Sequence, residues 1–291
     1  MLQDYSLPST VDEALSLLNM NKGNARIIAG GTDLMLDLES GKVNVGCLVD
    51  ISNIGDLKKI ELNGNKISIG AGVTHSEIAR STLIREKAVV LASACRAVGS
   101  LQIRNTGTLA GNVVNAQPAA DAAVALVALG AQAEISGPDG VKSIPVEELY
   151  AGLGKSKVDS TREMVTGITF PAPTKNQGSA FVRLAQRKAL ALPMLNVAVV
   201  VSISNNAFEW ARIVMAPVGP GPVRAAQAEE LLVGTEVGSE MIQKAAEAAR
   251  AQANPRSSAL RGSREYRQSV LEVLVRRALE TAVINAKSGS K

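Results

Sequence analysis

Residues 102–121 read QIRNTGTLAGNVVNAQPAAD, and this stretch decides how the rest of the chain is interpreted. Gly107 and Gly111 allow the backbone to approach a ligand, because glycine has no Cβ and tolerates unusual backbone angles. Thr108 and Asn112 add short hydrogen-bonding side chains. Successive backbone N–H groups in a turn can form a concave anion site. The stretch therefore predicts a loop that binds phosphate.

A second loop of small residues lies upstream, at residues 29–33, which read AGGTD. It stands between the apolar pairs at 27–28 and 34–35, so a short strand is expected before it and a helix after it. In α/β folds, ligands bind at such strand ends. We therefore predict that the two loops hold one diphosphate from opposite sides.

The composition predicts a globular chain with a substantial core. The 291 residues are enough for two domains, 46% are hydrophobic, and the net charge is only +4. Three Tyr, three Phe and one Trp, with scattered Lys and Arg, give no base-stacking surface, so no nucleic-acid partner is expected.

Metal centres and membrane segments are not predicted. Cys47 and Cys95 form no CxxC motif and cannot supply four thiolates to an iron–sulfur cluster, and His75 is the only histidine. The N-terminus lacks a signal-peptide pattern, and no apolar run reaches the length of a membrane span. We expect a cytoplasmic protein without a metal site of its own.

The N-terminal two thirds predict alternating short elements. Strands are expected at 26–29, 46–50 and 164–170, and helices after the cap at 9–10 and at 83–98 and 121–129. Turn signals predict hairpins around 63–65 and 137–140, and residues 74–77 match a capping box. Residues 102–120 are interpreted as a loop.

The pattern changes after residues 171–178, a run rich in proline, glycine and polar residues. Three antiparallel strands are expected at 180–184, 195–204 and 207–215, followed by helices at 225–232, 239–253 and 263–286. Strands followed by helices indicate an α+β domain.

The chain shows no catalytic group of its own. It has no GxGxxG after a strand and no GxxxxGK[ST], and one histidine gives no convincing nucleophile–base pair. An organic cofactor would then supply the chemistry, while the protein binds and orients it.

Three segments together resemble a known family: AGGTDL at 29–34, QIRNTGTLAGN at 102–112 and QPAAD at 117–121. They are similar to the FAD-binding segments of the medium, flavin subunit of molybdenum hydroxylases. That family includes xanthine dehydrogenase, aerobic carbon monoxide dehydrogenase, nicotinate dehydrogenase and 4-hydroxybenzoyl-CoA reductase. Further matches, such as GAGVTH at 70–75 and VRRA at 275–278, extend the resemblance over nearly the whole chain.

The resemblance implies an α+β fold with a two-lobed FAD-binding domain of the vanillyl-alcohol-oxidase/PCMH type. This domain would cover residues 1–173, with a small α/β lobe at 1–55 and a larger lobe at 56–173. A C-terminal α+β domain with a three-stranded sheet and packed helices would cover residues 178–287.

The resemblance also implies the cofactor contacts. Residues 27–34 match the first pyrophosphate loop and residues 108–112 the second, Asp121 matches a residue that binds the adenosine side, and Val165 matches an apolar position against the cofactor. Lys188 is the nearest cation in a stretch where some members carry a lysine. The FAD-binding residues expected in this way are Ile27, Ile28, Ala29, Gly30, Gly31, Thr32, Asp33, Leu34, Arg104, Thr108, Leu109, Ala110, Gly111, Asn112, Asp121, Val165 and Lys188.

Simpler roles remain open for several of these residues. Asp121 could cap the helix that follows it, and Arg104 could pair with a structural carboxylate instead of neutralising phosphates. Arg183 and Arg187 could form surface salt bridges only. His75 is interpreted as part of a capped turn.

Two residues depart from the family pattern. Ala110 replaces the usual first glycine of the GGN step, and Gln117 stands where serine is usual. They leave an alternative function open, a non-catalytic assembly or scaffold subunit that has lost tight FAD binding.

By resemblance, the chain is the flavin subunit of a complex that also contains a large subunit with the molybdenum cofactor and a small subunit with [2Fe–2S] clusters. FAD would collect electrons from the clusters and pass them to NAD⁺, oxygen or a quinone. A dimer of heterotrimers is the expected assembly. The substrate would bind to the large subunit, so this sequence does not reveal it.

Overall fold

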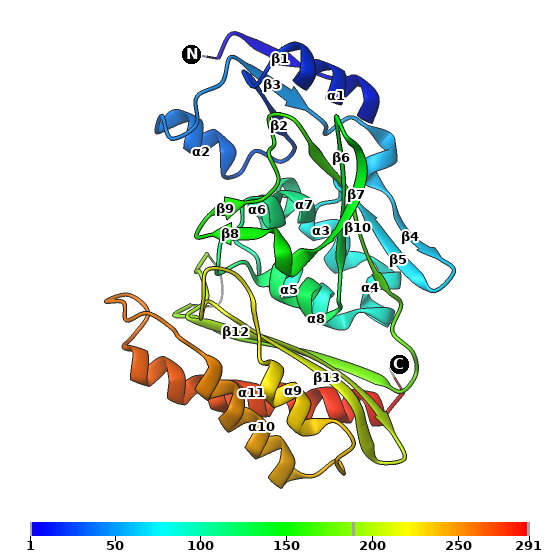
Figure 1. Ribbon diagram of the computed structural model, residues 1–291, viewed down its shortest axis with the longest axis vertical. Helices are drawn as coiled ribbons and strands as arrows, with labels where there is room; N and C mark the ends of the chain where they lie inside the picture. The colour runs from blue at the N-terminus through cyan, green and yellow to red at the C-terminus, as the bar shows by residue number, and fades with distance from the viewer. Residues whose placement is uncertain (1, 188–189, 290–291) are drawn as a thin grey trace.

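The computed structural model describes residues 2–187 and 190–289 and arranges them in three units, stacked from top to bottom in Figure 1. In these residues, no helix combines the length and the apolarity needed to cross a bilayer.

The N-terminal unit is a small parallel sheet with two helices. Its strands lie in the order β1 (Asp4–Ser6), β3 (Cys47–Asp50), β2 (Ala25–Ile28), and the helices are α1 (Val11–Met20) and α2 (Leu34–Glu39). Strand β2 ends directly before the first glycine loop, as the sequence predicts. Thr10 caps α1, since its side chain accepts a hydrogen bond from the Glu13 N–H at 3.1 Å.

The middle unit contains a five-stranded antiparallel sheet. The strand order is β4 (Ile60–Asn63), β5 (Lys66–Gly70), β10 (Met164–Pro171), β6 (Gln132–Gly137) and β7 (Gly140–Pro145). Both predicted hairpins are present, β4–β5 and β6–β7. A short pair, β8 (Tyr150–Gly152) and β9 (Lys155–Ser156), and two 3-10 turns, η1 (Gly55–Lys58) and η2 (Val146–Leu149), complete this part.

Helices pack beside this sheet. They are α3 (His75–Arg80), α4 (Thr82–Lys87), α5 (Val89–Ala97), α6 (Leu101–Thr106), α7 (Leu109–Val114) and α8 (Asp121–Ala128). The capping box predicted for α3 is present. The single helix predicted at 83–98 is wrong: it is divided into α4 and α5 at Ala88, whose φ of −137° and ψ of 56° are not helical.

The prediction of a continuous loop at 102–120 is also wrong, because α6 and α7 lie within it. Each helix begins after a hydroxyl cap. Ser100 Oγ accepts the Ile103 N–H at 3.2 Å, and Thr108 Oγ1 accepts the Gly111 N–H at 3.1 Å. Such caps stabilise the first turn of a helix. These two helices have only six residues each, too few to show a hydrophobic periodicity in the sequence.

The C-terminal unit is an antiparallel sheet covered by helices. The strands are β11 (Gln177–Leu184), β12 (Leu195–Ser204), β13 (Ala207–Ala216) and β14 (Val223–Arg224), and the helices are α9 (Ala226–Leu232), α10 (Ser239–Gln252) and α11 (Arg264–Lys287). The predicted sheet lacked the fourth strand, because β14 has only two residues and no periodicity.

Both faces of this sheet are buried. Alternate residues of β12 (Val197, Val199 and Val201) pack with α11, while Ala198 and Val200 belong to the core that contains α5 and α8. Figure 1 shows the C-terminal helices on one face and α5 and α8 on the other. Successive side chains of β12 point to opposite faces of the sheet, so one face packs on the C-terminal helices and the other on the middle unit. This packing joins the C-terminal unit to the middle unit.

Candidate functional site: a cleft between two glycine loops

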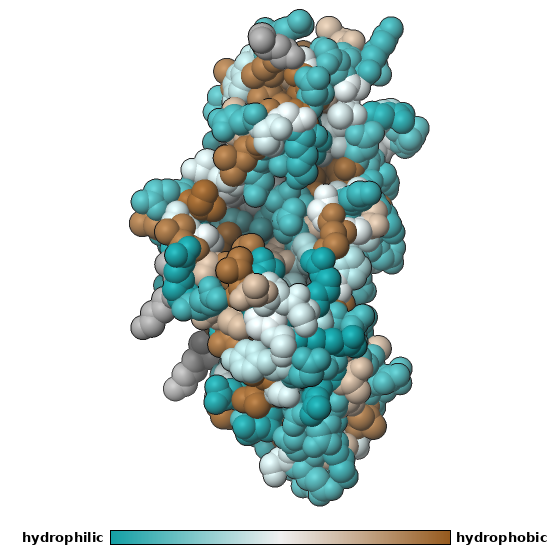
Figure 2. Space-filling view, turned by 90° about the vertical axis from the view of Figure 1, so that its left-hand side faces the viewer, coloured by the Kyte–Doolittle hydropathy of each residue, from teal (hydrophilic) through white to brown (hydrophobic). Residues whose placement is uncertain are grey.

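The two loops predicted from the sequence face each other across one cleft, with a volume of about 150 Å³. Figure 2 shows the molecule hollowed on this side, between the top unit and the middle of the molecule. The predicted residues that line the cleft are Ile27, Ile28, Ala29, Gly30, Gly31, Thr32, Asp33, Leu34, Thr108, Gly111 and Asn112.

The loops touch each other at Gly30. A Cβ added to Gly30 would lie 2.1 Å from the backbone oxygen of Thr106 and 2.9 Å from the Cα of Gly107. No side chain fits in that space, so glycine is required here by the contact between the loops. The spacing of the two cleft walls is therefore fixed by backbone packing.

The second loop is anchored to the segment before α3. The His75 N–H donates to the Gly107 carbonyl and the Leu109 N–H donates to the Val73 carbonyl, both at 3.1 Å. Thr74 and Thr108, which lie between these two hydrogen bonds, are paired as an isolated antiparallel β-bridge. This pairing holds Thr108, the cap of α7, at the edge of the cleft.

Backbone donors on both walls are free to bind an anion. Within the described residues, the N–H groups of Gly30, Gly31, Thr32 and Thr108 donate to no protein acceptor. Buried or partly buried N–H groups normally have partners, so four free donors around one cleft fit a ligand rich in acceptor oxygens. The diphosphate of FAD has this chemistry, and the walls therefore fit it.

Two of the residues that line the cleft each have a buried side-chain atom without a partner among the described residues: Nδ1 of His75 and Oδ1 of Asn112. His75 is 2% exposed. Burial first, and then the charge of Arg104, lower the pKa of His75 to about 4, so the imidazole is neutral at pH 7. In the sequence, the capping box at 74–77 indicates a structural role for His75, although GAGVTH at 70–75 is also one of the segments that match the family.

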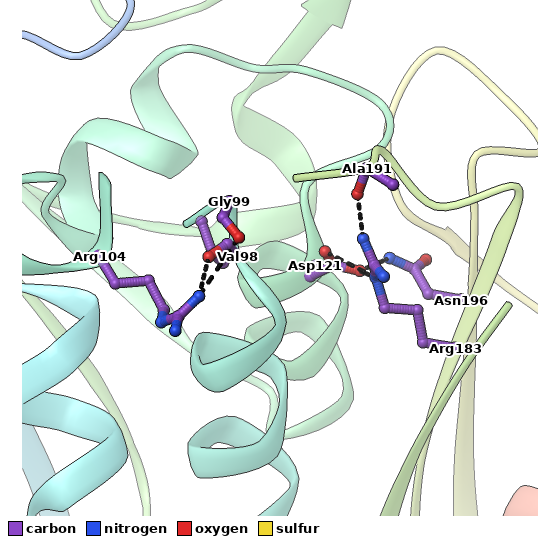
Figure 3. Close-up of polar contacts among 7 residues, drawn as sticks. All are labelled: Val98, Gly99, Arg104, Asp121, Arg183, Ala191 and Asn196. Carbon is purple, nitrogen blue, oxygen red and sulfur yellow. Dashed lines mark hydrogen bonds and ion pairs between the residues drawn. The ribbon is translucent and has the colours of Figure 1, made fainter. Parts of the chain in front are cut away.

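Five of the predicted residues that the structure describes do not line this cleft. Leu109 and Ala110 are buried in α7, and Val165 is buried in β10. Arg104 donates through Nη1 to the carbonyls of Val98 at 2.8 Å and Gly99 at 3.3 Å, as Figure 3 shows, and not to a carboxylate. Lys188 lies outside the described residues. The fifth residue away from the cleft is Asp121.

Asp121 lies in a buried polar cluster between the middle and C-terminal units (Figure 3). Its carboxylate accepts from Arg183 Nε at 3.2 Å and from Asn196 Nδ2 at 2.7 Å. Burial raises the pKa of Asp121 to about 6, although Arg183 and Asn196 each lower it. The cap alternative is wrong, since α8 begins at Asp121 and its N-cap, Ala120, has no side-chain bond. The surface alternative for Arg183 is also wrong, because its side chain is 12% exposed.

Sequence reasoning missed several residues of the cleft. His75 lines it from the middle unit, and Arg26 and Ser160 line it from the other side. Gly107 and Asn115 also line the cleft; they belong to the stretch at 102–121 that predicts a phosphate loop, although they are not among the individual FAD contacts expected from the resemblance. Nothing local in the sequence marks Ser160.

Comparison with known protein families assigns nearly the whole chain. A model described as "FAD binding domain in molybdopterin dehydrogenase" matches residues 1–173. A second, described as "CO dehydrogenase flavoprotein C-terminal domain", matches residues 180–282.

Individual relatives and solved structures agree with these models. The carbon monoxide dehydrogenase medium chain of Afipia carboxidovorans is 31% identical over 98% of both chains, and the xanthine dehydrogenase FAD-binding subunit of Escherichia coli O157:H7 is 27% identical over 99% of this chain and 97% of the relative. The carbon monoxide dehydrogenase structure from Hydrogenophaga pseudoflava superposes with a TM-score of 0.91 at 28% identity, covering 97% of each chain. Quinoline 2-oxidoreductase from Pseudomonas putida 86 gives a TM-score of 0.89 at 28% identity, covering 98% of each. The chain therefore belongs to the family of FAD-binding medium subunits of molybdenum hydroxylases.

Proposed function

We propose that the cleft between the two loops holds the diphosphate of FAD, and that this chain is the electron-transferring flavin subunit of its complex. The observation that carries the proposal is the set of backbone N–H groups on both walls that have no acceptor among residues 2–187 and 190–289: Gly30, Gly31 and Thr32 on one side and Thr108 on the other. Hydrogen bonds from backbone N–H groups to a charged acceptor are stronger than those to neutral ones.

The charges around the cleft are compatible with this assignment. Asp37 lines the cleft, but it is paired with Lys42 at 2.9 Å. Arg26 and Asp33 also line the cleft and carry opposite charges. The loops can then bind two phosphates without a lysine, mainly through the backbone.

When bound, FAD supplies the redox chemistry, because flavin exchanges electrons singly or in pairs. The chain's own residues bind and orient the cofactor. The α7 cap keeps Thr108 in place, and the Gly30 contact keeps the walls together. Arg104, Leu109, Ala110, Asp121, Val165 and Lys188 remain predicted contacts or supports for parts of the cofactor beyond the cleft.

The proposed partners are a large subunit with the molybdenum cofactor and a small subunit with [2Fe–2S] clusters, assembled as a cytoplasmic dimer of heterotrimers. Relatives named as medium chains of carbon monoxide and glyceraldehyde dehydrogenases support a complex of several chains. A solved relative described as a Cu,Mo-CO dehydrogenase supports a molybdenum-containing partner, and the Hydrogenophaga structure is of a form that lacks the Mo-pyranopterin moiety of that cofactor. The relatives are named as medium chains or FAD-binding subunits, which supports a flavin subunit and does not support a scaffold subunit that has lost FAD.

The function is tested with a glycine-to-tryptophan pair of variants. Gly111 lines the cleft, and a Cβ there meets only the Thr108 hydroxyl, at 3.0 Å. The indole of Gly111→Trp would fill the cleft without displacing a backbone segment. Gly55→Trp is the matched control, because Gly55 has nothing within 4 Å of an added Cβ and does not line the cleft.

We expect the wild-type chain and Gly55→Trp to be purified with the visible absorbance of bound flavin, and Gly111→Trp to lose it. A folded Gly111→Trp variant with full, tightly held flavin would show that the cofactor binds elsewhere.

A further inference from the structure

The chain's only histidine lies where the two loops meet. His75 begins α3 and lines the cleft. A Cβ added to Gly107 would lie 3.7 Å from His75 Cδ2 and 3.5 Å from Thr32 Oγ1, so the imidazole and the first loop flank the same glycine. A diphosphate held by both loops would be next to this ring.

The ring has no hydrogen-bond partner in the described part of the chain. His75 Nδ1 is buried without a partner, and Nε2, which is not among the buried unpaired atoms, also bonds to none of the described residues. A neutral imidazole has one donor and one acceptor, and leaving its buried nitrogen unpaired is costly. Its main-chain N–H already anchors Gly107, so the free ring is not needed for that contact.

The charges around the ring leave room for an anion. Arg104 of α6 acts on it directly, and Arg96 belongs to α5, which packs on α3. Across the cleft lie Arg26, Asp33 and Asp37, and Asp37 is neutralised by its ion pair with Lys42. Helix α3 itself carries Arg80 and Glu77, and the Glu77 carboxylate is hydrogen-bonded within the capping box. An anion beside the ring would favour the charged imidazole, and so oppose the effects of burial and of Arg104.

We propose that the imidazole of His75 hydrogen-bonds an oxygen of the FAD diphosphate, and that cofactor binding therefore takes up a proton on this ring as the pH falls. This inference rests on the proposed function. The proton comes from solvent, and no covalent bond changes.

The direction of the pH effect follows from the two states of the ring. Without ligand, the pKa of His75 is about 4. A bound diphosphate raises this pKa. Between the two values only the complex is protonated, so affinity for FAD increases as pH decreases, by up to about tenfold per pH unit for one proton.

Nuclear magnetic resonance on the full chain tests the contact directly, because one histidine gives one set of imidazole signals. The ring would be titrated in the free chain and with saturating FAD, ADP or riboflavin. We expect FAD and ADP, which contain a diphosphate, to raise the pKa of His75 by about one unit or more, and riboflavin, which has none, to leave it unchanged. An unchanged pKa with FAD bound would overturn the inference.

A second test measures FAD affinity by flavin fluorescence between pH 4 and pH 7, a range that includes the free pKa of His75 and the raised one, for wild type, His75→Gln and Asp56→Asn. Glutamine retains a hydrogen-bond donor but cannot take up a proton, so His75→Gln should lose the pH dependence and fold normally by circular dichroism. Asp56→Asn, which removes an exposed carboxylate that does not line the cleft, should keep it. An unchanged pH dependence in His75→Gln overturns the inference alone, whereas a wild-type chain that binds no FAD overturns the proposed function as well.

Discussion

At the scale of single residues, the Asp121 cluster connects two units through charge. Asp121 opens α8 in the middle unit, while Arg183 and Asn196 come from β11 and β12. Arg183 also donates through Nη2 to the carbonyl of Ala191, which fixes the connection between those strands (Figure 3). A buried carboxylate needs such partners, because removing it from water is costly.

Breaking this ion pair should strongly destabilise the fold. Arg183→Met would leave Asp121, which is 5% exposed, without its counter-charge, and we expect a loss of about 3–5 kcal/mol in the free energy of unfolding, measured with urea. The control is Lys244→Met, which removes an exposed pair with Glu240 on α10 and should leave the free energy of unfolding nearly unchanged. Equal effects of the two variants would show that the Asp121 cluster contributes little.

Single-residue roles were the hardest to predict from the sequence. Asp121 and Arg183 are 62 positions apart, and their pairing depends on how α8 packs against the C-terminal sheet. No local pattern contains that information. The unpaired ring of His75 could not be predicted for a similar reason, since it lies against Gly107, which is distant in the sequence.

At the scale of elements, the contact between the loops is the critical feature. Strand β2 delivers Gly30 to the end of α6, and the anchored bridge at Thr74 and Thr108 holds the start of α7. The sequence predicted β2 and both glycine loops, because strand ends and small residues leave clear local signals. It missed α6 and α7, whose six residues each are too few for a periodic pattern.

Gly30→Ala should open the cleft. Its Cβ would overlap the Thr106 carbonyl, so the loops must separate, and we expect a loss of about 1–3 kcal/mol in stability together with weaker FAD binding. Thermal unfolding and fluorescence titration with FAD would measure both effects. Gly55→Ala, which meets nothing within 4 Å, should change neither quantity. If Gly30→Ala bound FAD like the control, the spacing of the walls would not matter for the cofactor.

At the scale of the whole molecule, the three units have distinct tasks. The top and middle units form the cleft, and the C-terminal sheet packs on α5 and α8 with one face and on α11 with the other. Periodicity predicted most strands of this arrangement, and the resemblance predicted their assembly. Neither helical nor strand periodicity predicts that the two loops face each other. From the sequence alone, they are linked only by their small residues and by the family resemblance.

The most direct test of the account is a crystal structure of this chain with FAD bound. The account predicts diphosphate oxygens within about 3.2 Å of the backbone nitrogens of Gly30, Gly31, Thr32 or Thr108 on both walls of the cleft. A diphosphate bound at another place, or in contact with only one of the two loops, would contradict it.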